Sequence, residues 1–446
     1  MPSSKDILEA QRYNRRRLVN AFTSGTPGGR EVTAGSPVRP LLAGAALSLV
    51  LVLVAVVLGR FNPVLPGGWE DNLLVLVKGT GARYYTVGGV LHPVANVTSA
   101  RLLADPGDFT PSEVDAATIA GIPRGPAIGI VGAPDLLPAA DQLRSDQWTA
   151  CSTSRGRTHT WVAGDPDGLS PAQAAVVATA GEQYLVTQGT RYRLAEGVPI
   201  ALRLDSASVH EVDAGWLALL DTGADLAPLG IPRAGQPATG LPDTLGNAVI
   251  GSVLEVDRAG DPSRYLVTGP RQLTPLSEVA YQLYALGGGR DLGAPITAEV
   301  ADLGDLQVTA SPAVPAWPAA IGTTVDSGHR VCASLRETGG VATAALAEVP
   351  VSVAADPANA SSDTAGVSVA GGSGALARET TGGSIGVVKL VTDLGLAHGL
   401  EGDPADTLAR LGYPTTAVHD VPAAWLALVP AGVALSHDAA WATVAK

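Results

Sequence analysis

The sequence predicts a membrane-anchored α+β protein: a single N-terminal transmembrane helix followed by an elongated exported domain with a central core and four small repeat modules in pseudo-twofold arrangement. Three observations indicate this fold class. A long uncharged apolar run lies near the N-terminus, its two flanks carry opposite net charges, and one phrase occurs four times after it. We expect residues 1–38 to form a cytoplasmic basic helix and linker, 39–60 the transmembrane helix, and 61–446 the exported domain.

The first segment, "SKDILEAQRYNRRRLVNAFT", is expected to be helical over residues 4–23, with Ser3 as its cap and Gly25 at its end. Its apolar positions can form one stripe: Ile7, Leu8, Leu18, Val19 and Phe22. Its arginines are candidates for setting topology or for docking: Arg12, Arg15, Arg16 and Arg17. Such a helix can dock on a protein partner or on anionic lipid, or it can only set topology, and these interpretations stay open. Residues 24–38 are expected to be a flexible linker.

The uncharged run from Pro40 to Leu58 has 19 residues, which as a helix would cover about 28 Å, close to the hydrocarbon thickness of a bilayer. We assign Leu41 and Leu58 to the membrane anchor. No A-x-A-like exit follows the run, and its twin-arginine candidate, Arg15-Arg16-Arg17, stands more than twenty residues before it. An uncleaved anchor is therefore favoured over an export signal and over a buried core helix.

Charge predicts the orientation of this anchor. Residues 1–39 carry seven basic and three acidic residues, a net charge of +4, whereas the residues beyond carry 22 basic and 39 acidic ones, a net charge of −17. The positive-inside bias keeps the N-terminus in the cytoplasm and exports the acidic domain. The same acidity excludes nucleic acid as a partner of the exported domain.

A recurring phrase predicts repeated β-hairpins after the anchor. It is found at Leu74–Val87 ("LVLVKGTGARYYTV"), Tyr184–Gly197 ("YLVTQGTRYRLAEG"), Tyr265–Ser277 ("YLVTGPRQLTPLS") and, more faintly, Lys389–Leu400 ("KLVTDLGLAHGL"). Each copy is a β-branched strand, a turn and a second short run. Copies one and three continue into an L-x-P opening and an amphipathic helix, whereas two and four continue into "WLALL" or "WLALV". The alternation indicates a duplicated pair, with modules near 70–125, 182–240, 262–300 and 384–440.

The two cysteines, Cys151 and Cys332, occupy roughly matching places in the two halves of this duplication. On the oxidising side of the membrane a disulfide is the natural expectation, and two unrelated buried thiols are the alternative. We expect the pair to meet near a pseudo-twofold axis, in a central core that includes residues 126–181 and 305–350. Two cysteines without a neighbouring His pair cannot form a zinc site. Residues 352–383 are expected to be a long loop or linker.

Three motifs suggest catalysis, and the context argues against each. Gly382–Gly386 matches G-x-S-x-G, with Asp393 and His398 downstream, but a loop precedes its serine and a strand follows, the reverse of a nucleophile elbow. Asp221-Thr222-Gly223 lacks the second carboxylate of an aspartic protease, since Asp326-Ser327-Gly328 sits in a polar turn. None of the lysines, Lys5, Lys78, Lys389 and Lys446, belongs to a phosphate-binding loop. We therefore predict no catalytic, cofactor-binding or metal-binding residues.

The segments around the apolar run are the most specific in the chain. "AQRYNRRRLVNAFTSGTP" before it, and "LVKGTGARYYTVGGVLHPVANVTSARLLA" and "GIVGAPDLLP" (Gly129–Pro138) after it, resemble the EccB family of type VII (ESX) secretion membrane proteins of actinobacteria. The resemblance is dense over about residues 5–140, and beyond them it rests on the cysteine pair and the repeats. It implies one span and a long exported domain with a central core, four repeats and a disulfide.

The resemblance also implies a function. It would make the protein a structural core subunit of an inner-membrane secretion complex, with a cytoplasmic N-terminus and a periplasmic C-terminal domain. The expected partners are EccC, EccD, EccE, the mycosin protease, further copies of the chain and membrane lipid, and the expected role is assembly and export of WXG100-type substrates. The alternatives are an ATP-hydrolysing secretion component, which the missing phosphate loop makes doubtful, and a cell-wall-binding envelope protein.

Overall fold

The computed structural model describes the chain in two compact units, residues 1–64 and 65–446. The described residues are 3–24, 38–59, 65–258, 261–338, 341–351 and 366–444.

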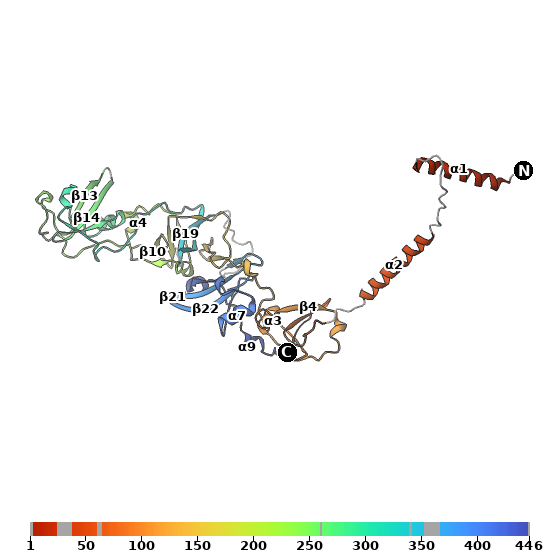
Figure 1. The fold of residues 1–446 in the computed structure, drawn as a ribbon. Helices are drawn as coiled ribbons and strands as arrows, with labels where there is room; N and C mark the ends of the chain where they lie inside the picture. The colour runs from red at the N-terminus through yellow and green to blue at the C-terminus, as the bar shows by residue number, and fades with distance from the viewer. Residues whose placement is uncertain are drawn as a thin grey trace. The chain divides into compact units, whose positions relative to one another are not determined.

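The N-terminal unit contains two helices in its described part, α1 (Ser4–Ser24) and α2 (Val38–Gly59), both in red in Figure 1. At the start of α1 the backbone N–H of Ser3 donates to the Asp6 carboxylate over 2.9 Å, which satisfies one of the free donors of a helix N-terminus. Both helices lie where the sequence predicts helices. Within the described residues, no helix meets the length and apolarity that a membrane crossing requires. The linker predicted at 24–38 lies almost entirely outside the described residues.

In residues 65–446, four of the sheets share one connectivity, and we call them modules 1 to 4. In each module three antiparallel strands follow one another, and a helix then leads to a fourth strand that runs parallel to the first. The helix is needed because a strand can join a parallel neighbour only through a crossover. A short helical turn then returns the chain alongside the third strand, as at Leu91 with Arg124 in module 1 and Ala397 with Ala431 in module 4.

The bounds of the modules are as follows. Module 1 contains β1 (Leu73–Val77), β2 (Arg83–Val87), β3 (Val90–Pro93), α3 (Val97–Leu103), β4 (Thr110–Val114) and η1 (Ala116–Ile119). Module 2 contains β8 (Ala174–Thr179), β9 (Glu182–Thr187), β10 (Thr190–Arg193), α4 (Val198–Ala201), β11 (Val209–Glu211), α5 (Ala214–Leu217) and β12 (Asp221–Thr222). Module 3 contains β13 (Val253–Arg258), β14 (Asp261–Gly269), β15 (Gln272–Leu276), α6 (Glu278–Leu286), β16 (Ile296–Ala298), η4 (Val300–Leu303) and β17 (Gln307–Val308). Module 4 contains β21 (Ala375–Thr381), β22 (Ser384–Val391), β23 (Ala397–Gly399), α7 (Pro404–Leu411), η5 (Thr415–Ala417), β24 (Val418–Pro422) and α8 (Ala423–Leu426).

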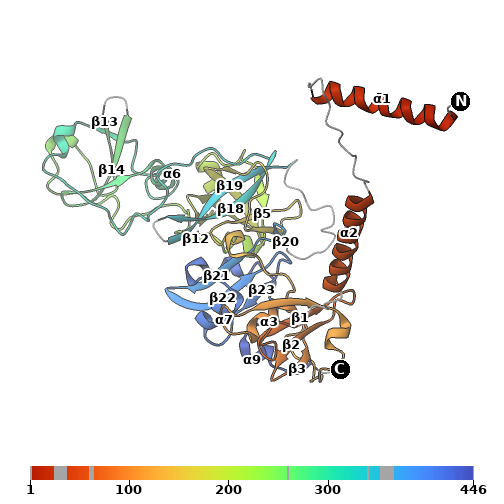
Figure 2. The same cartoon turned by 45° about the vertical axis from the view of Figure 1, so that its right-hand side comes forward.

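A fifth sheet lies between modules 2 and 4 and has the order β20-β6-β5-β18-β19-β7. Its strands are β5 (Trp148–Ser152), β6 (Thr158–Val162), β7 (Ser170–Pro171), β18 (His329–Thr338), β19 (Val341–Pro350) and β20 (Gly366–Val369). The two middle strands, β5 and β18, come from different halves of the chain and pair antiparallel. Figure 2 shows this sheet next to module 4, and the elements of module 4 are drawn in blue. Outside the sheets lie η2 (Ala140–Gln142), η3 (Asp243–Leu245) and α9 (His437–Ala440).

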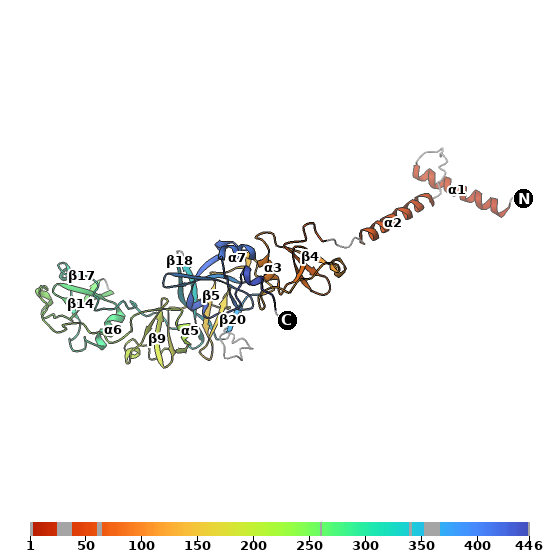
Figure 3. The same ribbon diagram turned by 90° about the horizontal axis from the view of Figure 1, so that it is seen from below.

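Buried apolar side chains show which parts pack together. One cluster joins the central sheet to modules 2 and 4. A second joins module 1 to module 4, and a third joins module 2 to module 3. The helices follow the same pairing, since α3 packs against α7 and α4 against α6, and Figure 3 shows α3 and α7 side by side. The predicted duplication makes module 3 the counterpart of module 1 and module 4 the counterpart of module 2. In the structure no module buries its helix against its counterpart: module 1 packs on module 4, and module 2 on module 3.

Three expectations about the repeats need correction. The echo at Leu74–Val87 covers β1 and β2, whereas the other three copies cover the second and third strands of their modules, so module 1 was matched one strand too early. Modules 2, 3 and 4 begin one strand before the expected bounds, at β8, β13 and β21. The "WLALL" stretch begins in α5, a helical turn, and helices also follow the third strands of modules 2 and 4. A helix as short as α4 (Val198–Ala201) makes about one turn, so the sequence shows no helical periodicity there.

The expected linker at 352–383 is also only partly right. Residues 352–365 lie outside the described residues, but Gly366–Val369 forms β20 of the central sheet, parallel to β6, and Ala375–Thr381 forms the first strand of module 4. Small residues fit here because the backbone of neighbouring strands and turns comes close. A Cβ on Gly374, for example, would clash with the carbonyl oxygen of Val391.

Candidate functional site

The central sheet contains a disulfide between Cys151 and Cys332, which are 181 residues apart in sequence. The two cysteines face each other directly across β5 and β18, so the bond joins the two halves of the chain at the middle of the central sheet. Both are buried, and Ala347 and Val349 of β19 pack with them. The disulfide that the sequence leads us to expect is therefore present, and its place is the strand pair that both halves build.

Two tryptophans, Trp216 in α5 and Trp425 in α8, are fully buried in the apolar cluster that joins the central sheet to modules 2 and 4. The Trp216 indole N–H donates to the Ala150 carbonyl oxygen over 2.9 Å. Asp213 caps α5 by accepting from the Trp216 backbone N–H at 2.8 Å, and it also accepts from Thr158 of β6. The Trp425 indole nitrogen has no hydrogen-bond partner among the described residues. The two modules thus use the same anchor with different polar support.

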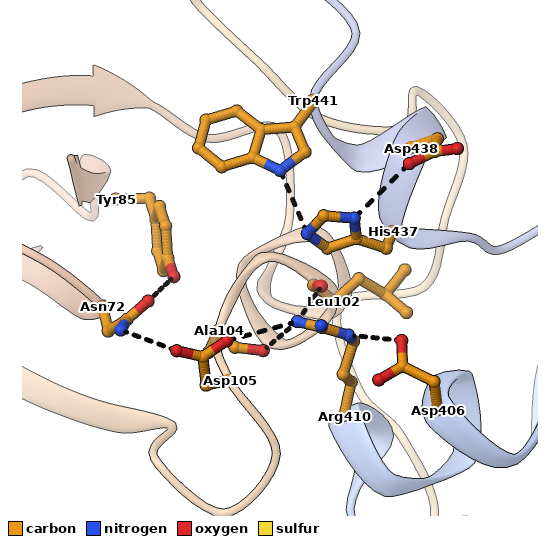
Figure 4. Close-up of polar contacts among 10 residues, drawn as sticks. All are labelled: Asn72, Tyr85, Leu102, Ala104, Asp105, Asp406, Arg410, His437, Asp438 and Trp441. Carbon is orange, nitrogen blue, oxygen red and sulfur yellow. Dashed lines mark hydrogen bonds and ion pairs between the residues drawn. The ribbon is translucent and has the colours of Figure 1, made fainter.

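Modules 1 and 4 meet in a second polar centre, shown in Figure 4. Arg410 of α7, with 13% of its side chain exposed, donates to the carbonyl oxygen of Ala104 over 2.7 Å and, more weakly, to that of Leu102 over 3.5 Å. These carbonyls lie at the C-terminal end of α3, where the last turn has acceptors without intrahelical partners. A cation also suits the negative end of a helix. Asp406, one turn earlier in α7, holds the guanidinium in place at 2.7 Å.

The same junction contains two buried tyrosines. The Tyr85 hydroxyl donates to the Asn72 side chain over 2.9 Å, and that amide donates in turn to Asp105. The Tyr413 hydroxyl donates to the Pro138 carbonyl oxygen over 2.7 Å. Burial raises the pKa of both phenols well above the ordinary value. Both therefore stay neutral donors across the physiological pH range.

The chain end strengthens this junction. Residues after α9 run antiparallel to the segment that follows η1: Thr443 bridges Ile128, the Gly129 N–H donates to Ala442, and the Val444 N–H donates to Ala127. Trp441 directly precedes these paired residues, and its indole N–H donates to the His437 ring over 3.1 Å. Module 1 is therefore held by helix α7, by the Arg410 cation and by the backbone pairing of residues 442–444.

A ring packed on a glycine recurs at the closing turn of three modules. The pairs are His92 with Gly125, Tyr192 with Gly223, and His398 with Gly432, and in each a Cβ on the glycine would overlap the ring. The N–H of each glycine donates to the third strand of its module, at 3.0, 2.9 and 2.8 Å. Thr309 donates in the same way to Leu273 of module 3. These residues were missed from sequence, because a ring followed by a glycine 33, 31 or 34 residues later is too common a pattern to notice.

The motifs that suggested catalysis occupy ordinary turns and strands. Gly382 and Gly383 form the β21–β22 hairpin turn and Ser384 begins β22. Asp221 and Thr222 form β12, and Gly223 carries the ring of Tyr192. Asp326 accepts from the backbone of Gly328 and from His329 in an exposed turn. Asp393 accepts from Gly372, and His398 donates to Val433. None of these side chains is arranged toward another as a nucleophile and its base would be.

The lysines are equally ordinary where they are described. Lys389 pairs with Glu379 across the β21–β22 hairpin at 2.8 Å, while Lys5 and Lys78 are exposed. Lys446 lies outside the described residues. Within those residues, no cluster of three or more His, Cys, Asp or Glu side chains is placed to hold a metal ion.

One cavity of about 500 Å³ lies where module 2 meets β19 of the central sheet. Its lining is neutral and includes Gln173, Thr187, Gln188 and Ala344. Gly189 approaches it so closely that a Cβ there would clash with the Ala344 carbonyl oxygen. The side chains that line this cavity carry no charge, and its polar groups are backbone, amide and hydroxyl groups.

The predicted anchor and docking residues lie in the N-terminal unit. Leu41 is 70% exposed in α2, and Leu58 lies in the same helix, with its side chain outside the described part. The four arginines of α1 are exposed: Arg12, Arg15, Arg16 and Arg17. All apolar residues of the predicted stripe on α1 are exposed too.

The chain matches the model of one protein family over nearly its whole length. The model described as "Type VII secretion system ESX-1, transport TM domain B" matches residues 1–445. The chain is 28% identical over 313 residues to the ESX-5 secretion system ATPase EccB5 of Mycobacterium tuberculosis, an alignment that covers 66% of this chain and 59% of that protein. The chain thus spans somewhat more than half the length of this relative.

Two solved structures have the same fold. A chain of an intact ESX-5 inner membrane complex matches with a TM-score of 0.67 and 24% identity, covering 100% of this chain and 96% of that one. A chain of an EccB3 dimer from the ESX-3 core complex matches with a TM-score of 0.68 and 23% identity, covering 83% of this chain and 99% of that one. At this level of identity the likeness establishes the fold.

Proposed function

This chain belongs to the EccB family of type VII secretion proteins, and from that premise we propose that it is a structural core subunit of an ESX inner-membrane complex. The observation that carries the proposal is the match of the family model over residues 1–445. The architecture supports it, because the disulfide, the two buried tryptophans and the paired modules hold residues 65–446 together as one compact unit. A compact unit with large surfaces suits a subunit that binds other subunits. Its task is assembly of the channel that exports WXG100-type substrates.

The topology follows from the same proposal. Residues 39–60 cross the inner membrane once, with Leu41 and Leu58 in the anchor, residues 1–38 in the cytoplasm and 61–446 in the periplasm. The net charges of +4 before Pro40 and −17 after Arg39 support this orientation. A periplasmic location also suits the disulfide, which persists in an oxidising compartment.

The exported part, in this proposal, is a central core with four repeats in pseudo-twofold arrangement. The shared connectivity of modules 1 to 4 supports the common origin of the repeats. The pairing of modules 1 with 4 and 2 with 3, and the packing of modules 2 and 4 on the sheet that holds the Cys151–Cys332 strand pair, support the symmetry. The axis would pass near the disulfide, where β5 and β18 meet.

The expected partners are EccC, EccD, EccE, the mycosin protease and further copies of the chain. A related chain lies in an ESX-5 inner membrane complex and another forms a dimer in an ESX-3 core complex, which supports membership in a complex and self-association. The name of the ESX-5 relative contains the word ATPase. This sequence has no G-x-x-x-x-G-K-[ST] loop, so we assign the chain no ATP hydrolysis.

The test is the size of the native assembly. A tagged chain, expressed with its own secretion operon and extracted in a mild detergent, should elute with other membrane subunits at many times its 45.0 kDa. Elution as a lone monomer under these conditions would contradict the structural role. ATP turnover by purified residues 65–446, abolished by one substitution, would support the enzyme instead, and retention on isolated peptidoglycan would support a wall-binding protein.

A further inference from the structure

The face of α1 that no described residue covers is strongly amphipathic. Its five exposed apolar side chains are Ile7 at 54%, Leu8 at 53%, Leu18 at 63%, Val19 at 55% and Phe22 at 91% exposure. With about 100° between successive residues of a helix, these five project into a sector of about 120°. Transfer of these side chains from water to an apolar environment is favourable, so a surface that buries this face would bind the helix.

Basic side chains border this apolar face on one side. By the same geometry Arg12, Lys5 and Arg16 project into the adjoining sector, and Arg15 lies within the apolar sector itself. The acidic residues of the helix, Asp6 and Glu9, project outside the apolar sector, with Glu9 next to Arg16. Long basic side chains can lay their stems along an apolar surface and keep their charges in a polar layer above it. The chemistry of this face is therefore that of an interfacial helix on an anionic surface.

The chain itself keeps such a surface within reach. Thirteen residues separate Ser24 at the end of α1 from Val38 at the start of α2, a span of at most about 50 Å. If α2 crosses the membrane, α1 is tethered beside the cytoplasmic leaflet, and its binding becomes an intramolecular step at high effective concentration. That leaflet is negatively charged, so it complements the excess of basic residues in α1.

We propose that α1 lies on the membrane surface, with Phe22 and its apolar neighbours among the acyl chains and Arg12 and Arg16 at anionic lipid headgroups. This inference rests on the proposed membrane span of α2. It favours lipid over a protein partner, because a tethered membrane surface is always present while a partner groove has to be supplied. Docking on another subunit is the competing outcome of the test.

The experiment uses the full chain in nanodiscs, whose two faces are both open to solvent. Because the native cysteines form a disulfide, a new cysteine at Phe22→Cys can be labelled alone with an environment-sensitive fluorophore. Leu8→Cys gives a second probe on the apolar face, and Tyr13→Cys is the matched control on the opposite face. Each variant is reconstituted in phosphatidylcholine with and without about 30% phosphatidylglycerol, which gives the surface a negative charge like that of the cytoplasmic leaflet.

In anionic nanodiscs, iodide quenching of the probes at positions 8 and 22 should fall about threefold or more relative to the probe at position 13. The protection should weaken in pure phosphatidylcholine, at high salt and in an Arg12→Gln/Arg16→Gln variant. Probes that remain open to iodide in anionic nanodiscs overturn the inference, and protection that appears only when other membrane subunits are added assigns the face to a protein. If the chain fails to co-elute with nanodiscs at all, the membrane span is wrong, and the inference falls with it.

Discussion

The imidazole of His398 packs directly on Gly432, and this contact fixes the closing turn of module 4. The ring is fully buried, with Nδ1–H donating to the Val433 carbonyl oxygen over 2.9 Å and Nε2 without a hydrogen-bond partner among the described residues. Gly432 in turn donates its N–H to Ala397 of β23. The same arrangement in modules 1 and 2 makes it a shared structural device, and its stability consequences can be measured.

Gly432→Ala should destabilise residues 65–446 by about 1–3 kcal/mol, because a methyl group there must displace the His398 ring from a packed interior. Chemical denaturation monitored by tryptophan fluorescence measures the change. Gly371→Ala is the control, since a Cβ at Gly371 meets nothing within 4 Å. If both substitutions lower the free energy of unfolding equally, the packing of the His398 ring does not require a glycine at position 432.

The buried His398 should make stability depend on pH. Burial lowers its pKa below the ordinary value, so the unfolded chain binds this proton more readily than the folded one. Stability should therefore be complete above about pH 6.5 and fall as the pH drops below it. Replacing the ring by His398→Phe should flatten the dependence of the unfolding midpoint between pH 7 and 5.5. A steep dependence that survives in His398→Phe would assign the effect to another group.

The two buried tryptophans should respond differently to loss of the indole N–H. Trp216→Phe removes a donor from the Ala150 carbonyl oxygen, whereas Trp425→Phe removes a nitrogen that has no described partner. Both lose similar apolar volume, so we expect Trp216→Phe to cost about 1 kcal/mol more than Trp425→Phe. Urea unfolding of the two variants side by side tests the difference. The opposite order would mean that Trp425 has the stronger polar contact.

Arg410→Ala should weaken the junction of modules 1 and 4. The change removes a largely buried guanidinium from the C-terminal end of α3 and leaves the Ala104 carbonyl oxygen and Asp406 without their cation. We expect a loss of about 2–3 kcal/mol in the free energy of unfolding. Arg378→Ala is the matched control, since that arginine pairs with Asp420 at the surface, and such pairs are worth at most about 1 kcal/mol. A similar loss in both variants would remove the special role of Arg410.

Loss of the disulfide should cost more than any of these changes. Closing a loop between residues 181 apart stabilises a fold by roughly 5 kcal/mol in the chain-entropy model, and usually by less in practice. Cys151→Ala/Cys332→Ala should lower the unfolding midpoint to that of the reduced wild type. A reductant should then have no further effect on the variant. If reduction leaves the unfolding midpoint of the wild type unchanged, the disulfide does not stabilise the fold.

The sequence by itself determined the features that depend on neighbours in the chain. The apolar run and the helix before it are set by composition and capping, and α1 and α2 lie at the predicted positions. The hairpin phrase fixes alternating strands and turns, so three of its four copies fall on equivalent strand pairs. The cysteine pair could be proposed because the sequence has only two cysteines and both follow the apolar run.

Only the tertiary structure decided which surfaces meet. The sequence suggested a duplicated pair in chain order, but module 1 packs on module 4 and module 2 on module 3, through apolar surfaces that become neighbours only in the folded chain. Arg410 gains its role only when α7 reaches the end of α3, 306 residues away from Ala104. Likewise, the match between His398 and Gly432 is a fit of shape, which no local pattern encodes.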